Sequence, residues 1–521
     1  MNLFGNNKKK QLTFEYIPDA KNPIEEDIDE NINKIKSVLE NCNDIVFRDF
    51  KIGGVEGRRS FLFYVDGMAD KVLINDFVLE PLMLISRQVS PSYEQIKNFL
   101  VDAVKSSALA VTEIREVETL EEALMAALSG DTALMIDKHN KAIIISSRAW
   151  PARGTSEPSS ETVIRGPRDG FVETIRMNTA LIRRRIRDPR LKVKQTQLGI
   201  RSQTDIAILY IDDIVDKRVL DELDKKLKKI NIDAILDSGY LQEFLENRNI
   251  TPLPQVQVTE RPDVVAAALY EGRVGILVDN SPFALIIPVT MTAYLQSPED
   301  YYARPMIATL SRWIRVFAML VAIIAPGLYI AIVSFHPDII PSKLAISIAA
   351  TRATVPFPAF IEAIIMEVTF ELIREAGIRL PRPIGSTIGI VGGLVIGQAA
   401  VSAGIVGPFM VIVVAITAIA SFAVPSHEIT AAVRILRFIF IIGASIYGLY
   451  GIMLVGICFA IHLVSLKSFG VPVMAPWAPF EWNDFKDGLV MRISMKYMRR
   501  RPEHYGPRDI IRQGGNKDDS K

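Results

Sequence analysis

Charge-free stretches divide this chain into two halves. Up to about residue 300, charged side chains are spread along the sequence as they are in soluble proteins, whereas runs without Asp, Glu, Lys or Arg dominate between Val316 and Leu466. About 20 consecutive apolar residues are enough for a helix to cross a bilayer. The pattern therefore predicts a soluble N-terminal half, followed by an all-α, polytopic membrane domain at residues 305–490.

The soluble half contains an internal repeat. FYVDGMADKVL (63–73) resembles LYIDDIVDKRVL (209–220), and GDTALMIDKHNKAIII (130–145) resembles GRVGILVDNSPFALII (272–287), in the same order. Each copy begins with a strand-like run, continues through helical segments and closes with two short apolar strands around an aspartate turn. We expect two similar α/β subdomains, at residues 41–150 and 201–300. Chance similarity between strand–turn–helix units is the alternative.

Three polar segments flank these subdomains. Residues 1–40 form a polar N-terminal arm with an acidic run, and residues 151–200 form a basic connecting segment. The basic segment is interpreted either as an anion or docking surface, or as a solvated helix face. It lacks interleaved aromatic residues, so nucleic-acid binding is not expected. Residues 491–521 form a basic tail, which the positive-inside rule places in the cytoplasm.

The apolar half contains more candidate crossings than a simple topology allows. We expect a span at Val316–Phe335, kinked near Pro326, and two spans within Ile384–Pro425. Phe438–Leu466 is long enough for one tilted span and short for two. Because both ends of the chain are expected on the cytoplasmic side, one stretch must be re-entrant or interfacial, or the last run must double back. Our choice for the exceptional stretch is residues 341–376.

One predicted span, Gly385–Gly404, has two distinct faces. Glycines recur at every fourth residue on one face, which allows another helix to approach closely; they are Gly385, Gly389, Gly393 and Gly397. The opposite face is apolar to weakly polar and is interpreted as lining a pore, with an apolar gate between polar positions; its residues are Thr387, Val391, Leu394, Val395, Gln398 and Ser402. Polar residues that only bond to neighbouring helices are the alternative.

A helix expected at residues 360–376 carries several acids. Glu367 and Glu371 lie on one face, and Glu362 points elsewhere. Acidic side chains at membrane depth are typical of ion pathways, so these three are candidate ion-pathway residues. The alternative is a helix at the cytoplasmic interface with its acids in water.

The chain offers little catalytic or metal chemistry. It has a net charge of +1, two cysteines and five histidines. Neither a Ser/His/Asp constellation nor metal-ligand spacing stands out, and the glycine-rich segment at residues 53–57 lacks the Lys and Ser/Thr of a P-loop. We therefore expect no enzymatic activity, no catalytic residue, no cofactor and no metal.

Two long motifs resemble a known family. They are EPSSETVIRGPRDGFVETIRMNTALIRRRI, which begins at Glu157, and the apolar sequence from ATRATVPFPAFIEAIIMEV to ITAIASFAVPS, at residues 350–426. Both resemble the A subunit of the GerA-type spore germinant receptors, and the likeness extends over about residues 45–495. Its extent and the order of its motifs make it specific.

This resemblance implies partners and an activity. The A subunit acts with a transporter-like B subunit that binds the nutrient and with a lipoprotein C subunit, in the spore inner membrane. The implied activity is that of an oligomeric, ligand-gated cation channel, with pentamers favoured, in a multi-pass protein whose N-terminal domain is cytoplasmic. A non-conducting membrane scaffold in the same complex is the alternative.

Overall fold

The computed structural model describes residues 23–52, 57–83, 113–149, 157–158, 161–247, 251–379, 395, 397–485, 487–488 and 494–512. By its internal contacts the chain divides into two compact units. We call the first the two-sheet unit; it comprises residues 1–245, 256–288 and 495–521. The second, the helical unit, comprises residues 246–255 and 289–494.

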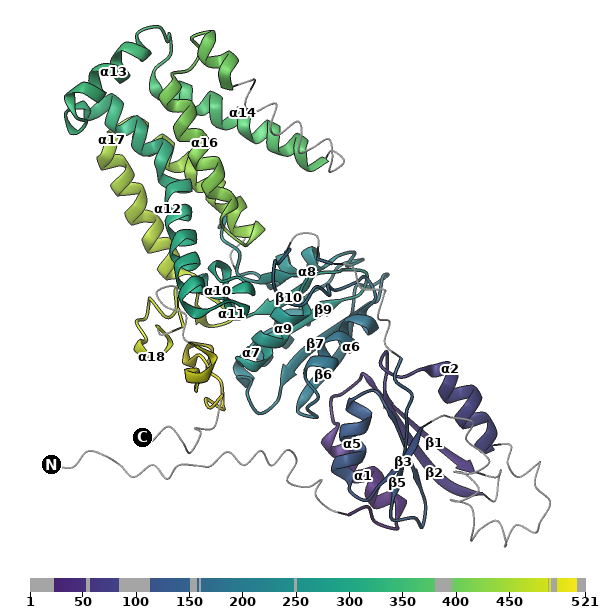
Figure 1. Cartoon of the computed structure of the whole chain (residues 1–521). Helices are drawn as coiled ribbons and strands as arrows, with labels where there is room; N and C mark the ends of the chain where they lie inside the picture. Colours follow the sequence, from purple (N-terminus) through teal and green to yellow (C-terminus); the bar gives the residue numbers. More distant parts are fainter. Residues whose placement is uncertain are drawn as a thin grey trace, which may run out of the picture. The chain divides into compact units, whose positions relative to one another are not determined.

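The first subdomain of the two-sheet unit is a five-stranded sheet covered by helices (Figure 1). Its strands run in the order β1-β2-β4-β5-β3, and every neighbouring pair is antiparallel. They are β1 (Ile45–Ile52), β2 (Arg58–Val65), β3 (Ile114–Val117), β4 (Thr132–Ile136) and β5 (Ala142–Ile145). Helices α1 (Ile28–Val38) and α5 (Leu120–Leu128) pack on one face, and α2 (Lys71–Ile74) with the π-helical turn Asn75–Leu79 packs on the other.

Both faces of this sheet are buried, and the strand sequences explain why. Side chains alternate between the faces along a strand. Phe61 and Phe63 of β2 contact the core under α1 and α5, whereas Leu62 and Tyr64 belong to the core under α2. A strand that is covered on both faces needs a continuous apolar run rather than an alternating one. This is the run that the sequence displays.

The second subdomain repeats the same architecture. Its sheet has the order β6-β7-β9-β10-β8 and is also antiparallel. Its strands are β6 (Leu191–Leu198), β7 (Thr204–Ile211), β8 (Gln257–Thr259), β9 (Val274–Val278) and β10 (Ala284–Ile287). Its helices are α6 (Ile175–Arg185), α7 (Lys217–Leu227), α8 (Ser238–Leu245) and α9 (Pro262–Tyr270). The predicted fold of two similar subdomains is confirmed.

The likeness extends to the register of the strands. Phe61 faces Met135 in the first sheet, and the aligned residues of the repeat, Ala207 and Leu277, face each other in the second. Likewise, the pair Thr132 and Ile145 corresponds to the pair Val274 and Ile287. A one-residue slip would turn every side chain to the other face. The sequence repeat is therefore a structural repeat, residue by residue.

The same local signals build both copies. The carboxylates of Asp70 and Asp216 cap the helices that follow them, each accepting a backbone hydrogen bond of 2.9 Å. Gly130 and Gly272 follow α5 and α9 with φ angles of 98° and 88°, which a glycine adopts without steric cost. Conserving these caps and turns in both copies fixes where each helix begins and ends.

The two subdomains are joined by backbone pairing and by a buried ion pair. The backbone N–H of Asn43 donates to the Val193 carbonyl at 3.0 Å, next to an isolated parallel bridge between Cys42 and Val193. Arg183 forms two 2.9 Å hydrogen bonds to the Asp44 carboxylate, and both side chains are buried. The subdomains therefore form one continuous structure.

The helical unit is built mainly from long apolar helices. Among the described residues, the helices whose bounds are defined are α10 (Met291–Leu295), α11 (Glu299–Tyr302), α12 (Pro305–Phe335), α13 (Ser342–Arg352), α14 (Ala359–Arg379), α16 (Pro408–Phe422), α17 (His427–Ser465) and α18 (Trp482–Phe485). A two-stranded ribbon, β11 (Lys467–Ser468) and β12 (Val471–Pro472), follows α17. Among the described residues, α12 and α17 are long and apolar enough to cross a membrane, and α16 is a shorter apolar helix.

Helix α17 folds back on itself at Gly448. This residue has non-helical backbone angles, with a φ of 61°. A straight helix would separate Gly443 from Gly451 by about 12 Å, yet a methyl group on Gly451 would overlap the Gly443 carbonyl. Side chains from both arms, including Phe440 and Val455, share one apolar core. The last apolar run therefore doubles back, which is the option that we passed over when we chose residues 341–376 as the exceptional stretch. The membrane crossings themselves stay a prediction.

Candidate functional site: buried ion pairs of the helical unit

Helix α14 carries the three acids that the sequence marked as ion-pathway candidates. Glu362 and Glu367 are buried and Glu371 is partly exposed. Each acid faces an arginine from another helix. The expected division of faces is present, because Glu367 and Glu371 contact α17 whereas Glu362 contacts α13 and the start of α16. For Glu362 and Glu367, the alternative of acids in open water does not hold.

Glu362 is held at the N-terminus of α16. Its carboxylate accepts a 2.8 Å hydrogen bond from the backbone N–H of Gly407, the N-cap residue, and it pairs with Arg352 at 3.3 Å. A carboxylate there satisfies a free N–H and interacts favourably with the helix dipole. A side chain at Gly407 would crowd the carboxylate, since an added Cβ would lie 3.3 Å from it.

Glu367 connects three helices through one arginine. Arg437 of α17 donates to the Glu367 carboxylate at 2.6 Å and to the Ala322 carbonyl of α12 at 2.8 Å. One turn further along α14, Glu371 pairs with Arg434 of α17 and lies 3.9 Å from Arg374. Arginines 434 and 437 are three residues apart and acids 367 and 371 are four apart, so each pair spans about one helical turn and the two pairs fix α14 against α17.

Arg374 sits on the other side of this cluster. It donates to the Ser421 hydroxyl at 3.2 Å, and its guanidinium lies 5.4 Å from the centre of the Phe422 ring. Both contacts are to the last turn of α16. Together with Glu362 at the first turn, α14 thus binds both ends of α16 through charged side chains.

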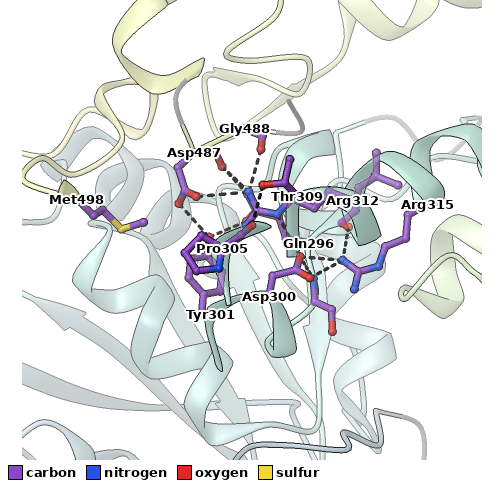
Figure 2. Close-up of polar contacts among 12 residues, drawn as sticks. Gln296, Asp300, Tyr301, Pro305, Thr309, Arg312, Arg315, Asp487, Gly488 and Met498 are labelled. Carbon is purple, nitrogen blue, oxygen red and sulfur yellow. Dashed lines mark hydrogen bonds and ion pairs between the residues drawn. The ribbon is translucent and has the colours of Figure 1, made fainter. Parts of the chain in front are cut away.

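A second charged cluster lies at the start of α12. Figure 2 shows the Arg312 guanidinium between Asp300 and the segment Asp487–Gly488. Arg312 donates to Asp300 at 3.1 Å and to the Gly488 carbonyl at 2.8 Å, and Arg315 donates to Asp300 at 2.7 Å. Arg312 and Asp300 are fully buried. This cluster ties the first long helix to the chain that follows the last one.

These clusters hold helices of the unit together through paired charges. A buried ion pair contributes little net stability, but breaking it leaves a buried charge and is costly. Every described acid of the site faces an arginine. The partners Arg434, Arg437 and Asp487 were not predicted from the sequence. The sequence signal that could have identified the arginines is their position within or beside apolar runs.

The proposed pore helix is only partly described. Gly385, Gly389, Gly393, Thr387, Val391 and Leu394 lie outside the described residues. Gly397 is buried, and an added Cβ would lie 3.5 Å from the Val411 side chain of α16. The Val395 side chain is 56% exposed, and Gln398 and Ser402 are also exposed. Within its described part, the glycine face packs against α16, and the other positions face away from the chain.

Comparison with known proteins identifies the family. The family model of the Bacillus/Clostridium GerA spore germination protein matches residues 33–504. The chain is 42% identical to spore germination protein GerLA of Bacillus cereus, over 93% of this chain and 97% of the relative. It is 42% identical to spore germination protein KA of Bacillus subtilis, over 93% and 88%, and 40% identical to the uncharacterized membrane protein YfkQ of the same organism, over 99% and 98%.

A solved structure shows a further similarity. It is the crystal structure of the N-terminal domain of the A subunit of the Bacillus megaterium spore germinant receptor GerK3, which is 32% identical to this chain. The match covers 51% of this chain and 96% of that one, with a TM-score of 0.39. Since the family model matches most of its length, this chain belongs to the GerA family of spore germination proteins.

Proposed function

We propose that this protein is the A subunit of a nutrient germinant receptor and forms an oligomeric, ligand-gated cation channel. In this proposal the helical unit crosses the spore inner membrane several times, with the two-sheet unit in the cytoplasm. A transporter-like B subunit binds the nutrient, a lipoprotein C subunit completes the receptor, and several copies of this chain, favoured to be five, surround the pore. Opening of the pore releases cations and triggers germination.

The exposure of Gln398 and Ser402 carries the proposal. Polar side chains on a membrane-buried helix are favourable when they face water, a polar partner or another copy of the chain rather than lipid. Both are exposed, while Gly397 of the same helix is buried against α16. A ring of copies with these side chains toward its axis gives them a hydrated path. Exposed Val395, together with Val391 and Leu394, supplies the apolar constriction that closes it by dewetting.

The paired acids of α14 hold the closed arrangement in this proposal. The pore face has no charged residue, so selectivity for cations must come from elsewhere. Glu362, Glu367 and Glu371 are the candidates, and each is neutralised by an arginine in the described conformation. Opening would separate Glu362 from Arg352 of α13 and expose the Glu362 carboxylate to the pathway.

A flux assay tests the position of the gate. Val395→Ala should let cations leak from liposomes that contain the purified protein without nutrient, because a smaller side chain widens and wets the constriction. Ile412→Ala is the matched control, since Ile412 of α16 is 55% exposed and lies outside the proposed pore face. Liposomes with Val395→Ala that stay as tight as the parent, or an equal leak with Ile412→Ala, would show that the gate is misplaced.

Planar-bilayer recording separates a channel from a scaffold. The purified protein should give stepwise conductance, and the Val395→Ala variant should give a higher open fraction. If neither the parent protein nor the variant conducts when the partner subunits are added, the scaffold function is favoured.

A further inference from the structure

The structural repeat shows what should follow the last strand of each subdomain. In the first subdomain the chain continues after β5 and pairs with the loop that follows β2. The Ala149 N–H donates to the Met68 carbonyl at 3.0 Å, and the Asp70 N–H donates to the Ser147 carbonyl at 2.8 Å. Ala69 and Arg148 form an antiparallel bridge. Residues 147–149 thus pair with residues 68–70, in the loop at the end of β2.

The second subdomain cannot use its own chain in this way. Ile214 is the residue that the repeat aligns with Met68, but the chain after β10 passes into the helical unit at Val289. The C-terminal tail fills the same position instead. The Arg508 N–H donates to the Ile214 carbonyl at 2.8 Å, and the Arg508 side chain donates to the Val215 carbonyl at 3.1 Å. An equivalent backbone acceptor is therefore satisfied from a distant part of the sequence.

Further contacts make this a specific docking site. Arg501 is buried and donates to the Tyr270 carbonyl at 2.7 Å and to Asp509 at 2.9 Å. Tyr505 is 4% exposed, and the Arg273 guanidinium lies 5.1 Å from the centre of its ring. The site thus combines backbone acceptors in the loops where β7 ends and β9 begins, a buried arginine and a buried aromatic ring.

We propose that the loops where β7 ends and β9 begins, residues 212–216 and 270–273, form a peptide-docking site, and that its occupant is residues 498–512 of the same chain. We call this occupant the strap. The chain enters the helical unit directly from β10 and leaves it just before the strap. The docked strap therefore makes the second subdomain hold both ends of the helical unit. Releasing the strap frees one of them, which makes docking a control point for the movement of the helices.

The strap differs physically from a covalent extension of the sheet. Apart from the Arg500–Ile511 bridge within the strap itself and a short 3-10 turn at Glu503–Tyr505, it has no regular structure among its described residues. Segments held by a few side chains and isolated backbone hydrogen bonds open more easily than core strands. Its two buried anchors, Arg501 and Tyr505, control that equilibrium.

A photocrosslinking experiment tests the docking. Tyr505→p-benzoylphenylalanine in the full-length protein places a photoreactive ring where the tyrosine ring lies. Irradiation should give a product of monomer mass in which residue 505 is joined to the peptide that contains Tyr270 and Arg273. Adding Arg501→Ala should reduce the yield at least about fivefold, because it removes the buried anchor.

The neighbouring Arg500 provides the matched control. Its side chain is 62% exposed, so Arg500→Ala removes the same charge and should leave the crosslink yield unchanged. A product of dimer mass, a crosslink to another protein, or equal yields for the two arginine variants would overturn docking of the strap on its own subdomain.

The proposed role of the strap in the movement of the helices rests on the proposed channel function, and it needs a separate measurement. In liposomes that contain the complete receptor, Arg501→Ala should reduce nutrient-evoked cation flux about tenfold or more, and Arg500→Ala should not. Normal flux after loss of the crosslink would remove the coupling role. Absence of flux from the unmodified receptor would refute the channel, while the crosslink result would still decide docking.

Discussion

The buried pair between Asp44 and Arg183 gives the sharpest test of how the two subdomains are joined. Asp44→Asn keeps the size of the side chain but removes its charge. Arg183 then stays fully buried without an anionic partner. Its remaining hydrogen bonds go to backbone carbonyls of Asp188 and Leu191, which do not carry a full charge. We expect the junction between the subdomains to open far more often in the variant.

The burial of this ion pair determines how much the opening equilibrium of the junction should change. Removing one partner of a buried ion pair costs about 3–5 kcal/mol. Since about 1.4 kcal/mol is a tenfold change in an equilibrium, the opening equilibrium should increase by roughly two to three and a half orders of magnitude. The exposed pair of Asp49 with Arg59 is the control, with side chains 47% and 39% exposed. Asp49→Asn should cost at most about 1 kcal/mol, or roughly fivefold.

Hydrogen exchange of the full-length protein measures both changes. The informative amides are those of Asn43 and Val193, which pair across the junction. Amides of β4, in the middle of the first sheet, report on the rest of that subdomain. The reasoning predicts a large loss of protection at the junction in Asp44→Asn and a small loss in Asp49→Asn. Equal protection in the two variants would refute the idea that this buried pair holds the subdomains together.

Two further predictions concern the turn of α17 and the basic connecting segment. Gly448→Ala should destabilise the purified protein by about 1–2 kcal/mol or more, because the φ of Gly448 is 61° and an added Cβ would lie 2.9 Å from Phe335. Thermal inactivation measures this change. Gly456→Ala is the control and should be neutral in that assay, since an added Cβ at Gly456 meets open space. Burial raises the pKa of Glu161 to about 7, against a hydrogen bond from Thr259 that lowers it. The folded state therefore binds this proton more tightly than the unfolded state, and stability should fall as pH rises from the ordinary glutamate pKa to about 7, then stay level. Limited proteolysis should show residues near Glu161 better protected at about pH 5.5 than at about pH 8, and a Glu161→Gln variant that kept the full difference would exclude this carboxyl as its cause.

The sequence was sufficient for the repeat but not for the complete sheets. The matching segments contain β2, β4, β5 and their counterparts, whose apolar runs and aspartate turns are strong local signals. Strands β1 and β3 were not recognised. β1 carries charged residues such as Arg48 and Asp49 and has exposed positions, and β3 is only four residues long. Both are edge strands, whose positions depend on pairing with a neighbour rather than on their own pattern.

The sequence predicted the acidic member of these ion pairs but not the arginine. The acids of α14 were conspicuous because an apolar region surrounds them. Their partners Arg434 and Arg437 lie 63 and 70 residues further along the chain, and no spacing rule connects residues on different helices. The reversal at Gly448 had the same difficulty. A glycine within a long apolar helix is common, and the turn is recognised from the backbone angles of Gly448 and from the approach of Gly443 to Gly451.

The way α14 is anchored restricts how the proposed pore helix can move. That helix lies between α14 and α16 in the sequence. Glu362 holds the first turn of α16, and Arg374 contacts its last turn. Glu367 and Glu371 in turn bind α14 to α17. Pulling α14 from α17 alone would leave buried charges without partners, at several kcal/mol each. A motion that carries α14, α16 and the first arm of α17 together avoids this cost, because all of these pairs stay intact. Gating should therefore displace these helices as one body against α12, where Arg437 contributes a hydrogen bond to the Ala322 carbonyl that a small shift can break.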